Sequence, residues 1–176
     1  MSTHHTDYSD EMIGGVGIVV QLDESKFAKR KYHRGHRVGD GSWVFGGIDS
    51  NKKVFAVSVA DRTRDTLVPI LDKYVKPGSI IYSDGFTPYI DLEMYTDAAS
   101  GGHWAVNHSE NYVDPHSGVH TNNIEATWGP MKKHIDKRNR GLHTIDIHLK
   151  EYIWKKANRD TLWESLLDAM SVVDWV

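Results

Sequence analysis

The stretch that decides the fold reads His120-Thr-Asn-Asn-Ile-Glu-Ala-Thr-Trp-Gly-Pro-Met-Lys-Lys133. Thr121 or Asn122 is suited to begin a helix, because a short polar side chain accepts hydrogen bonds from the free backbone N–H groups of the first turn. Apolar residues then recur at helical spacing, namely Ile124, Trp128, Met131 and Ile135. The stretch therefore predicts a helix with one apolar face.

Two charged side chains of this helix, Glu125 and Lys132, are seven residues apart and so lie about two turns apart on the same side. A carboxylate and an ammonium in this arrangement suit a site that binds metal and phosphate together. Ordinary surface charge on an amphipathic helix explains the same pattern. Pro130 removes the hydrogen bond back to Ala126, so we expect the helix to kink between the two charges.

The composition is that of one globular domain. A chain of 176 residues with 39% hydrophobic residues and six tryptophans is long and apolar enough to bury one core. We expect a flexible leader over residues 1–13 and a single domain over residues 14–176, with the helices from residue 144 packed on it. The absence of cysteine excludes disulfides and thiolate zinc sites.

The sequence also predicts where the protein is found. No apolar run approaches the ~20 residues of a membrane helix, so we expect no membrane partner. The start of the chain lacks the basic and apolar segments of a signal peptide. We therefore expect an intracellular protein, in the nucleus of a eukaryote or in the cytoplasm and nucleoid of a bacterium.

The net charge of −3 hides two strongly basic segments. Residues 26–37 hold six Lys and Arg and no acid, and residues 129–159 hold nine Lys and Arg against three acidic residues. The rest of the chain is acidic. Charge concentrated in this way is typical of a face that binds a polyanion such as nucleic acid. Solvated loops whose neighbours in space cancel their charge would give the same pattern.

Three strands are predicted in the first third of the chain. Residues 16–22 form a mostly apolar run, typical of a strand buried on both faces, and Asp23 ends it. Side chains alternate along a strand, so Asp23 and Glu24 point to opposite faces. Residues 43–49 and 54–60 predict two further strands, and their short connection makes the three an antiparallel meander.

A helix and two more strands follow. Thr63 can cap a helix that Pro77-Gly78 closes. Residues 79–83 predict a short buried strand that ends at Asp84, and residues 103–108 predict a fifth strand. A strand–helix–strand unit of this size implies parallel pairing with the first strand.

Two C-terminal helices complete the prediction. The first runs from Thr144 to about Ala157, and a capping box at Thr161 and Glu164 begins the second. The second helix carries apolar residues at the spacing of a core-facing stripe, namely Leu162, Leu166, Leu167 and Met170.

This order of elements resembles the ribonuclease-H-like fold, an α/β class with a mixed five-stranded sheet flanked by helices. In such a sheet the first and fourth strands are neighbours. Their ends would bring Asp23 and Asp84 together, and the helix that begins at Thr121 would place Glu125 over them.

Several blocks of sequence resemble the catalytic domain of DDE transposases, and the nearest group is the insertion-sequence type that includes the Merlin elements. The resemblance extends from about Gly14 to about Trp154. The blocks are Leu22-Asp-Glu-Ser-Lys-Phe27 with Arg30-Lys-Tyr32, Trp43-Val-Phe-Gly-Gly-Ile48, Ile80-Ile81 with Ser83-Asp84, Val106-Asn-His-Ser109 with Asn111-Tyr-Val-Asp-Pro115, and His120-Thr-Asn122 with Ile124, Glu125 and Trp128.

The resemblance implies that Asp23, Asp84 and Glu125 form a metal-binding catalytic triad and that Lys132 is a catalytic basic residue. Clustered carboxylates repel one another by about 1 kcal/mol per pair at ~4 Å in water and about 4 at an effective dielectric of 20, so they need a cation. All-oxygen ligands favour Mg²⁺ or Mn²⁺. We expect two ions that assist in-line displacement at phosphorus, hence DNA strand cleavage and strand transfer.

The same reading assigns DNA contacts. We expect phosphate contacts from the basic loop, with Tyr32 also able to stack on a base, and from the helix that carries Lys132. The DNA-binding candidates are Lys26, Lys29, Arg30, Lys31, Tyr32, Arg34, Arg37 and Lys133. The candidates for structural support of the site are Asn107, His108, Asn122 and Trp128. A zinc site is disfavoured, because His103, His108, His116 and His120 match no compact zinc spacing.

The implied partners are transposon ends and target DNA, with a homo-oligomer as the active form and no small-molecule substrate. Because the chain begins close to its first predicted strand, we expect it not to recognise element ends by itself. Two rival functions stay open: a non-catalytic or domesticated DNA- or protein-binding remnant of a transposase, and a plain nuclease of the same fold.

Overall fold

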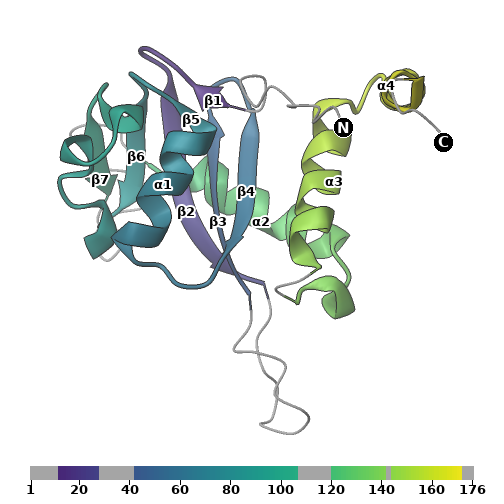
Figure 1. The fold of residues 1–176 in the computed structure, drawn as a ribbon, viewed down its shortest axis with the longest axis horizontal. Helices are drawn as coiled ribbons and strands as arrows, with labels where there is room; N and C mark the ends of the chain where they lie inside the picture. The colour runs from purple at the N-terminus through teal and green to yellow at the C-terminus, as the bar shows by residue number, and fades with distance from the viewer. Residues whose placement is uncertain (1–11, 28–41, 107–119, 142–143, 172–176) are drawn as a thin grey trace, which may run out of the picture.

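A computed structural model describes residues 12–27, 42–106, 120–141 and 144–171 (Figure 1). Its centre is a five-stranded sheet with the strand order β4-β3-β2-β6-β7. The strands are β2 (Val19–Lys26), β3 (Trp43–Asp49), β4 (Val54–Val59), β6 (Ile80–Asp84) and β7 (His103–Val106).

The sheet is mixed, as the sequence predicts. β2 pairs antiparallel with β3, and β3 pairs antiparallel with β4. β6 pairs parallel with β2 on one side and with β7 on the other. The predicted α/β class, with a mixed five-stranded sheet flanked by helices, is therefore confirmed.

The bounds of the first strand differ from the prediction. β2 starts at Val19 and continues to Lys26, so Asp23 lies inside the strand and does not end it. The extension follows from pairing with β3, whose ladder runs on to Lys26 opposite Trp43, whereas the ladder with β6 ends at Gln21. A strand that is paired along one side continues through polar residues that would otherwise suggest a turn.

Helices cover both faces of the sheet (Figure 1). α1 (Arg64–Tyr74) lies on one face, α2 (Asn122–His134) lies on the other, and α3 (Ile145–Ala157) lies beside the edge strand β4. Short 3₁₀ turns at 87–89, 92–94 and 97–99 connect β6 to β7. Two small strands, β1 (Ile13–Gly14) and β5 (Val75–Lys76), form a separate parallel pair.

Each face of the sheet has its own apolar core. The core under α1 includes Leu22 and Ile81 from the sheet and Leu67 and Leu71 from the helix. Ile13 belongs to this core and is 2% exposed, although the predicted leader ends at this residue. The core under α2 and α3 contains the four apolar residues predicted for the central helix, Ile124, Trp128, Met131 and Ile135.

The last helix does not pack as its sequence suggests. α4 (Leu162–Ser171) has no buried residue, and Figure 1 shows it standing away from the sheet. The four apolar residues predicted to face the core are between 38% and 49% exposed. The spacing was right for an apolar stripe but does not specify what the stripe covers.

No helix within the described residues combines the length and the apolar character that crossing a membrane requires.

Candidate functional site

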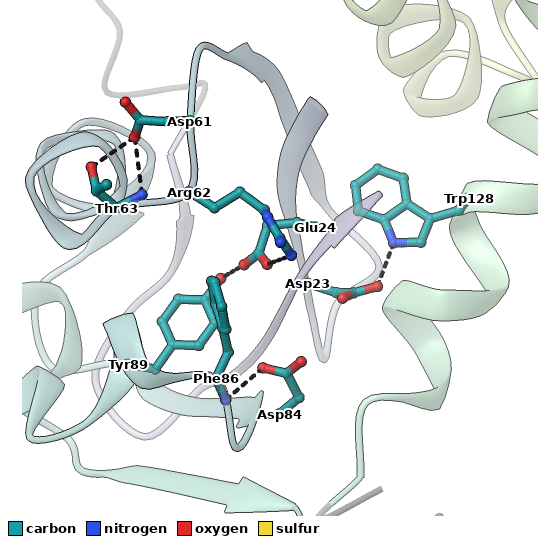
Figure 2. A network of polar contacts seen from close by, with 9 residues as sticks. All are labelled: Asp23, Glu24, Asp61, Arg62, Thr63, Asp84, Phe86, Tyr89 and Trp128. Atoms are coloured by element: carbon teal, nitrogen blue, oxygen red, sulfur yellow. Dashed lines mark hydrogen bonds and ion pairs between the residues drawn. The ribbon is translucent and has the colours of Figure 1, made fainter. Parts of the chain in front are cut away.

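Asp23 and Asp84 are neighbours on adjacent parallel strands. The register pairs Val19 with Ile80 and Gln21 with Tyr82, so its continuation brings Asp23 level with Asp84. Residues level with each other on neighbouring strands, which lie ~4.8 Å apart, point to the same face of the sheet. The two carboxylates are therefore together on the face that α2 covers (Figure 2).

The Asp23 carboxylate is held by the tryptophan of the central helix. Trp128 Nε1 donates to Asp23 Oδ2 at 2.7 Å, and the indole is 5% exposed (Figure 2). Gly46 lies opposite Asp23 on β3 and leaves room for this ring. A Cβ atom at position 46 would lie 2.7 Å from Trp128 Cη2 and 2.7 Å from the Phe55 carbonyl oxygen. The absence of a side chain at Gly46 is thus a condition for the bond between Trp128 and Asp23.

The environment of Asp23 disfavours its charge. Burial raises the pKa of the Asp23 carboxyl to about 6, the hydrogen bond from Trp128 opposes the rise, and the negative charges of Asp84 and Glu125 add to it. Because Asp84 and Glu125 both affect the pKa of Asp23, the three acids form one electrostatic cluster. Asp84 is oriented by its own turn, because Phe86 N donates to Asp84 Oδ1 at 3.1 Å.

Glu125 lies in the first turn of α2 and is exposed to solvent. Its Oε1 accepts a hydrogen bond from Thr121 Oγ1 at 2.8 Å. Among the residues that the structure describes, no group of three His, Asp or Glu side chains is arranged to hold a metal ion. The three acids are thus close enough for their charges to interact, but their side chains would have to rearrange before they could share a metal ion.

A fourth acid, Glu24, is part of this cluster. It faces the α1 side of the sheet, as strand alternation predicts, where Tyr89 donates a hydrogen bond to it and Arg62 lies 3.7 Å away (Figure 2). Burial raises the pKa of the Glu24 carboxyl to about 8, with further contributions from Asp84 and Asp23 and an opposing one from Arg62. The sequence analysis placed Glu24 on the face opposite Asp23 and so left it out of the candidate site residues, although it lies beside Asp23 in the chain.

The start of α2 is fixed by a residue of β2 and not by a local cap. Thr121 is at the N-cap position, but its side chain makes no capping bond. Gln21 Oε1 accepts instead from Asn123 N at 2.9 Å and from Ile124 N at 3.3 Å. Asn122, predicted to support the site, is exposed at the first helical position. The Gln21 amide is 5% exposed, and it fixes the first turn that carries Glu125.

Lys132 of α2 contacts β2, the strand that carries Asp23. Its Nζ donates to Ser25 Oγ at 2.6 Å and lies 5.3 Å from the centroid of the Phe27 ring. Ser25 follows Asp23 by two residues and so faces the same side of β2. α2 continues unbroken from 122 to 134 past Pro130, so the predicted kink does not interrupt the helix.

Two other DNA-binding candidates are described. Lys26 lies at the end of β2 with its Nζ 5.5 Å from the centroid of the Trp43 ring, and Lys133 is exposed on α2. The remaining DNA-binding candidates, and Asn107 and His108, lie outside the described residues. The two ends of the basic loop meet beside the site, because Phe27 N donates to the Ser42 carbonyl oxygen at 2.9 Å.

Arg140, in the second basic segment, has a structural role. Arg140 Nε donates to the Ile135 carbonyl oxygen at 3.0 Å, and its Nη1 donates to the Phe27 carbonyl oxygen at 3.2 Å. It also donates to the Lys132 carbonyl oxygen. Ser42 Oγ in turn donates to the Arg140 carbonyl oxygen at 2.8 Å. Arg140 therefore joins the end of α2 to both ends of the basic loop, which charge counting did not predict.

The face that carries Asp84 also has an aromatic pair that the sequence analysis did not single out. Tyr82 and Trp104 are opposite each other on β6 and β7, with ring centroids 6.3 Å apart at 75°. Trp104 is 43% exposed. Its ring lies over Gly102, where a Cβ atom would be 2.4 Å from Trp104 Cη2. Tyr82 precedes Asp84 by two residues and so shares its face of the sheet.

Adjacent parallel strands that carry Asp23 and Asp84, with Glu125 on the helix that follows the fifth strand of the sheet, define the class of the protein. It is a ribonuclease-H-like α/β domain, as its sequence predicts.

The chain belongs to the ISXO2-like transposase domain family, which matches residues 13–159. An "uncharacterized transposase-like protein" of Haemophilus influenzae is 34% identical to it over 110 residues, covering 61% of this chain and 84% of the relative. These similarities confirm the predicted transposase family. They do not distinguish the Merlin type within it.

Proposed function

We propose that the domain is a metal-dependent DNA transposase that cuts one DNA strand and joins its 3′ end to target DNA. Two observations carry the proposal. The parallel register of β2 and β6, continued two residues past its last pair, brings Asp23 level with Asp84. The charges of Asp84 and Glu125 also act on Asp23. Membership of the ISXO2-like transposase family supports DNA as the substrate. The proposal includes the likeness to insertion-sequence and Merlin elements, an intracellular location and assembly into a homo-oligomer on transposon ends.

The available ligands suit a hard divalent cation. Asp23, Asp84 and Glu125 offer carboxylate oxygens, which Mg²⁺ and Mn²⁺ prefer. Asp84 and Glu125 raise the pKa of Asp23 through their negative charge, and a cation among them would relieve this repulsion. We propose that these three residues hold two ions. Bound there, the ions would polarise the phosphodiester and activate the attacking oxygen.

The residues around the acids prepare this arrangement. Trp128 fixes one oxygen of Asp23, and Phe86 N fixes one oxygen of Asp84. Glu125 would exchange its hydrogen bond from Thr121 for a ligand position, which needs a change of side-chain rotamer within the fixed first turn of α2. The cost is about that of one hydrogen bond, ~1 kcal/mol, and is small against the binding of a divalent ion.

The chemistry conserves atoms at each step. In cleavage, a water oxygen bonds to phosphorus while the phosphorus–O3′ bond breaks, and the 3′ oxygen gains a proton as the water loses one. In transfer, that 3′-hydroxyl oxygen bonds to a target phosphorus and releases another 3′-hydroxyl. The Lys132 ammonium donates to Ser25, which follows Asp23 by two residues on the same strand face, and it would neutralise charge on the phosphate.

Substitution of one acid tests the proposal. Asp84→Asn keeps the shape and the bond from Phe86 N but removes a negative charge, so we expect loss of Mn²⁺-dependent nicking and joining of labelled DNA. Thermal unfolding without metal should change little. Asp65→Asn, the same chemical change at an exposed position of α1, should leave both properties as in the wild type. Unchanged nicking by Asp84→Asn would contradict the proposal.

One observation favours a non-catalytic remnant as the second candidate: the described acids do not form a ready-made metal site. Calorimetric titration with Mn²⁺ separates the two candidates. The transposase proposal expects binding that Glu125→Ala weakens by at least tenfold, whereas a remnant would bind DNA with no such metal dependence. Formation of joined products from a 3′-hydroxyl donor distinguishes a transposase from a plain nuclease, which makes none.

A further inference from the structure

A groove opens at the sheet edge opposite β7. It lies between β4 and α3 (Figure 1) and has a volume of about 690 Å³. The first half of β4 and the last turns of α3 form its walls, with Val54, Ala56, Ile153 and Trp154 among the apolar lining residues. At the other end of α3, Asp146 accepts from Ser58 N at 2.8 Å and holds the helix to the strand.

Lysines surround this apolar groove, namely Lys52, Lys53, Lys150 and Lys156. All four are exposed, and no acidic residue is among those that line the groove. Burial lowers the pKa of Lys156, and the positive charge of Lys52 lowers it further. The cations therefore repel one another, and an acidic partner would relieve that repulsion.

α4 offers the complementary surface. Leu162, Trp163, Leu166, Leu167 and Met170 fall on one side of the helix and are 38% to 67% exposed. The helix carries Glu164 and Asp168 and no Lys, Arg or His. An apolar stripe of this size on a surface marks a site of association.

The connection between the helices keeps α4 out of the groove of its own chain. Asn158 N and Nδ2 both donate to the Trp154 carbonyl oxygen, at 3.0 and 2.9 Å, and Thr161 N donates to the Asn158 carbonyl oxygen at 3.1 Å. Ser165 N continues the turn with a bond to the Thr161 carbonyl oxygen at 2.9 Å. This bonded turn directs α4 away from β4, and folding it back would break these bonds.

We propose that α4 of one copy docks into the groove between β4 and α3 of a second copy of this chain. Each copy has both the helix and the groove, so a reciprocal exchange closes as a two-fold dimer. Apolar side chains fill the groove, and Glu164 lies near its lysines. The inference does not depend on the chemistry proposed above, because it concerns residues away from Asp23 and Asp84.

Sedimentation velocity of the full chain, without DNA, tests the exchange. We expect a concentration-dependent dimer that Leu166→Glu with Leu167→Glu weakens by at least 100-fold in Kd. Lys150→Glu and Glu164→Lys should each weaken it by about tenfold, and an equimolar mixture of these two variants should recover part of the association. Asp65→Lys is the matched control, because it makes the same charge reversal at an exposed position of α1 and should change Kd less than threefold.

The absence of cysteine allows a direct measurement of proximity. One variant carries Leu167→Cys on α4, and another carries Ala157→Cys in the groove. Oxidation of their mixture should give a covalent heterodimer, while Asp65→Cys in place of Ala157→Cys should not. A wild-type chain that stays monomeric, or no mixed crosslink, would overturn the proposal. So would a Lys150→Glu variant that loses DNA affinity but keeps its dimer, because the groove would then be a DNA site.

Discussion

At the scale of residues, the site depends on where each acid points. Asp23 faces Trp128 and Asp84, while Glu24, the next residue, faces Tyr89 and Arg62. Strand alternation predicted that these two side chains would point to opposite faces of the sheet. The structure shows that opposite faces of one strand are still close enough for Asp84 to raise the pKa of Glu24.

Glu24 should make the metal-free protein less stable as pH rises. Its pKa is about 8 in the folded chain against an ordinary 4.5, so between these values the folded state holds a proton that the unfolded state has lost. Stability is then greatest below pH 4.5 for this group and declines towards pH 8. Asp23, with a pKa of about 6, adds in the same direction, and the positive charge of Arg62 opposes the rise in the pKa of Glu24.

The measurement is thermal unfolding in EDTA across that interval of pH. Glu24→Gln should give a flatter profile than the wild type and a higher midpoint at pH 8. Asp65→Asn, at an exposed position, should follow the wild-type curve. Equal slopes for the wild type and Glu24→Gln would show that the buried acid does not hold its proton.

At the scale of elements, α2 and β2 run in the same direction and are joined at three levels. Gln21, Asp23 and Ser25 on the strand meet the Ile124 amide, the Trp128 indole and the Lys132 ammonium on the helix. A helix-start signal is normally sought next to the helix, and Gln21 lies about 100 residues away in sequence. The sequence therefore predicted the helix and its apolar face but not the group that fixes its start.

Removal of the Gln21 acceptor should loosen the first turn of α2. Gln21→Met keeps the volume of the side chain but leaves the amides of residues 123 and 124 without their partner, at a cost of about 1–2 kcal/mol in the free energy of unfolding. Urea unfolding measures the cost, and hydrogen exchange should be faster at those two amides. Asn122→Ala, an exposed neighbour, should cost less than ~0.5 kcal/mol. Similar losses for both variants would assign the capping role to the local residue.

At the scale of the whole molecule, described residues of both basic segments come together at one end of the sheet. Phe27 and Ser42, the ends of the basic loop, meet each other, and Arg140 and Lys132 are at the same place. Sequence counting identified both basic segments but counted Arg140 as a free cation. Its bonds to three carbonyl oxygens show that part of the charge builds the scaffold.

DNA affinity should depend steeply on salt. With about six phosphate contacts, affinity should fall about 10³-fold between roughly 50 and 200 mM salt. Replacing Lys29, Arg30 and Lys31 by Ala should lower the slope of log affinity against log salt by about 2.7. Fluorescence anisotropy measures both. The control replaces Lys73 and Lys76, at the C-terminal end of α1 and just after it, by Ala. This variant should have the same slope of log affinity against log salt as the wild type. A slope that does not change on loop neutralisation would remove the loop from the DNA surface.

Hydrophobic runs and alternation are local properties, and they predicted where the strands lie. The resemblance of their order to the ribonuclease-H-like fold predicted the class of fold and the neighbouring positions of Asp23 and Asp84. The partner of α4 and the pairing that extends β2 past Asp23 could not be predicted, because both depend on surfaces brought together by the complete chain. For α4 the apolar stripe was visible in the sequence, but the surface that it covers was not.

The three levels that join β2 and α2 also limit how the family can vary. Two strand residues advance about 6.7 Å and four helical residues about 6.0 Å, so the two elements drift apart by roughly 0.7 Å per level. A mismatch of about 1.4 Å across three levels is within what side chains can absorb, whereas a fourth level would exceed it. Two residues of the strand and four residues of the helix thus span nearly equal distances. Inserting or deleting a single residue in either would move Trp128 off Asp23, so natural variants should change length elsewhere.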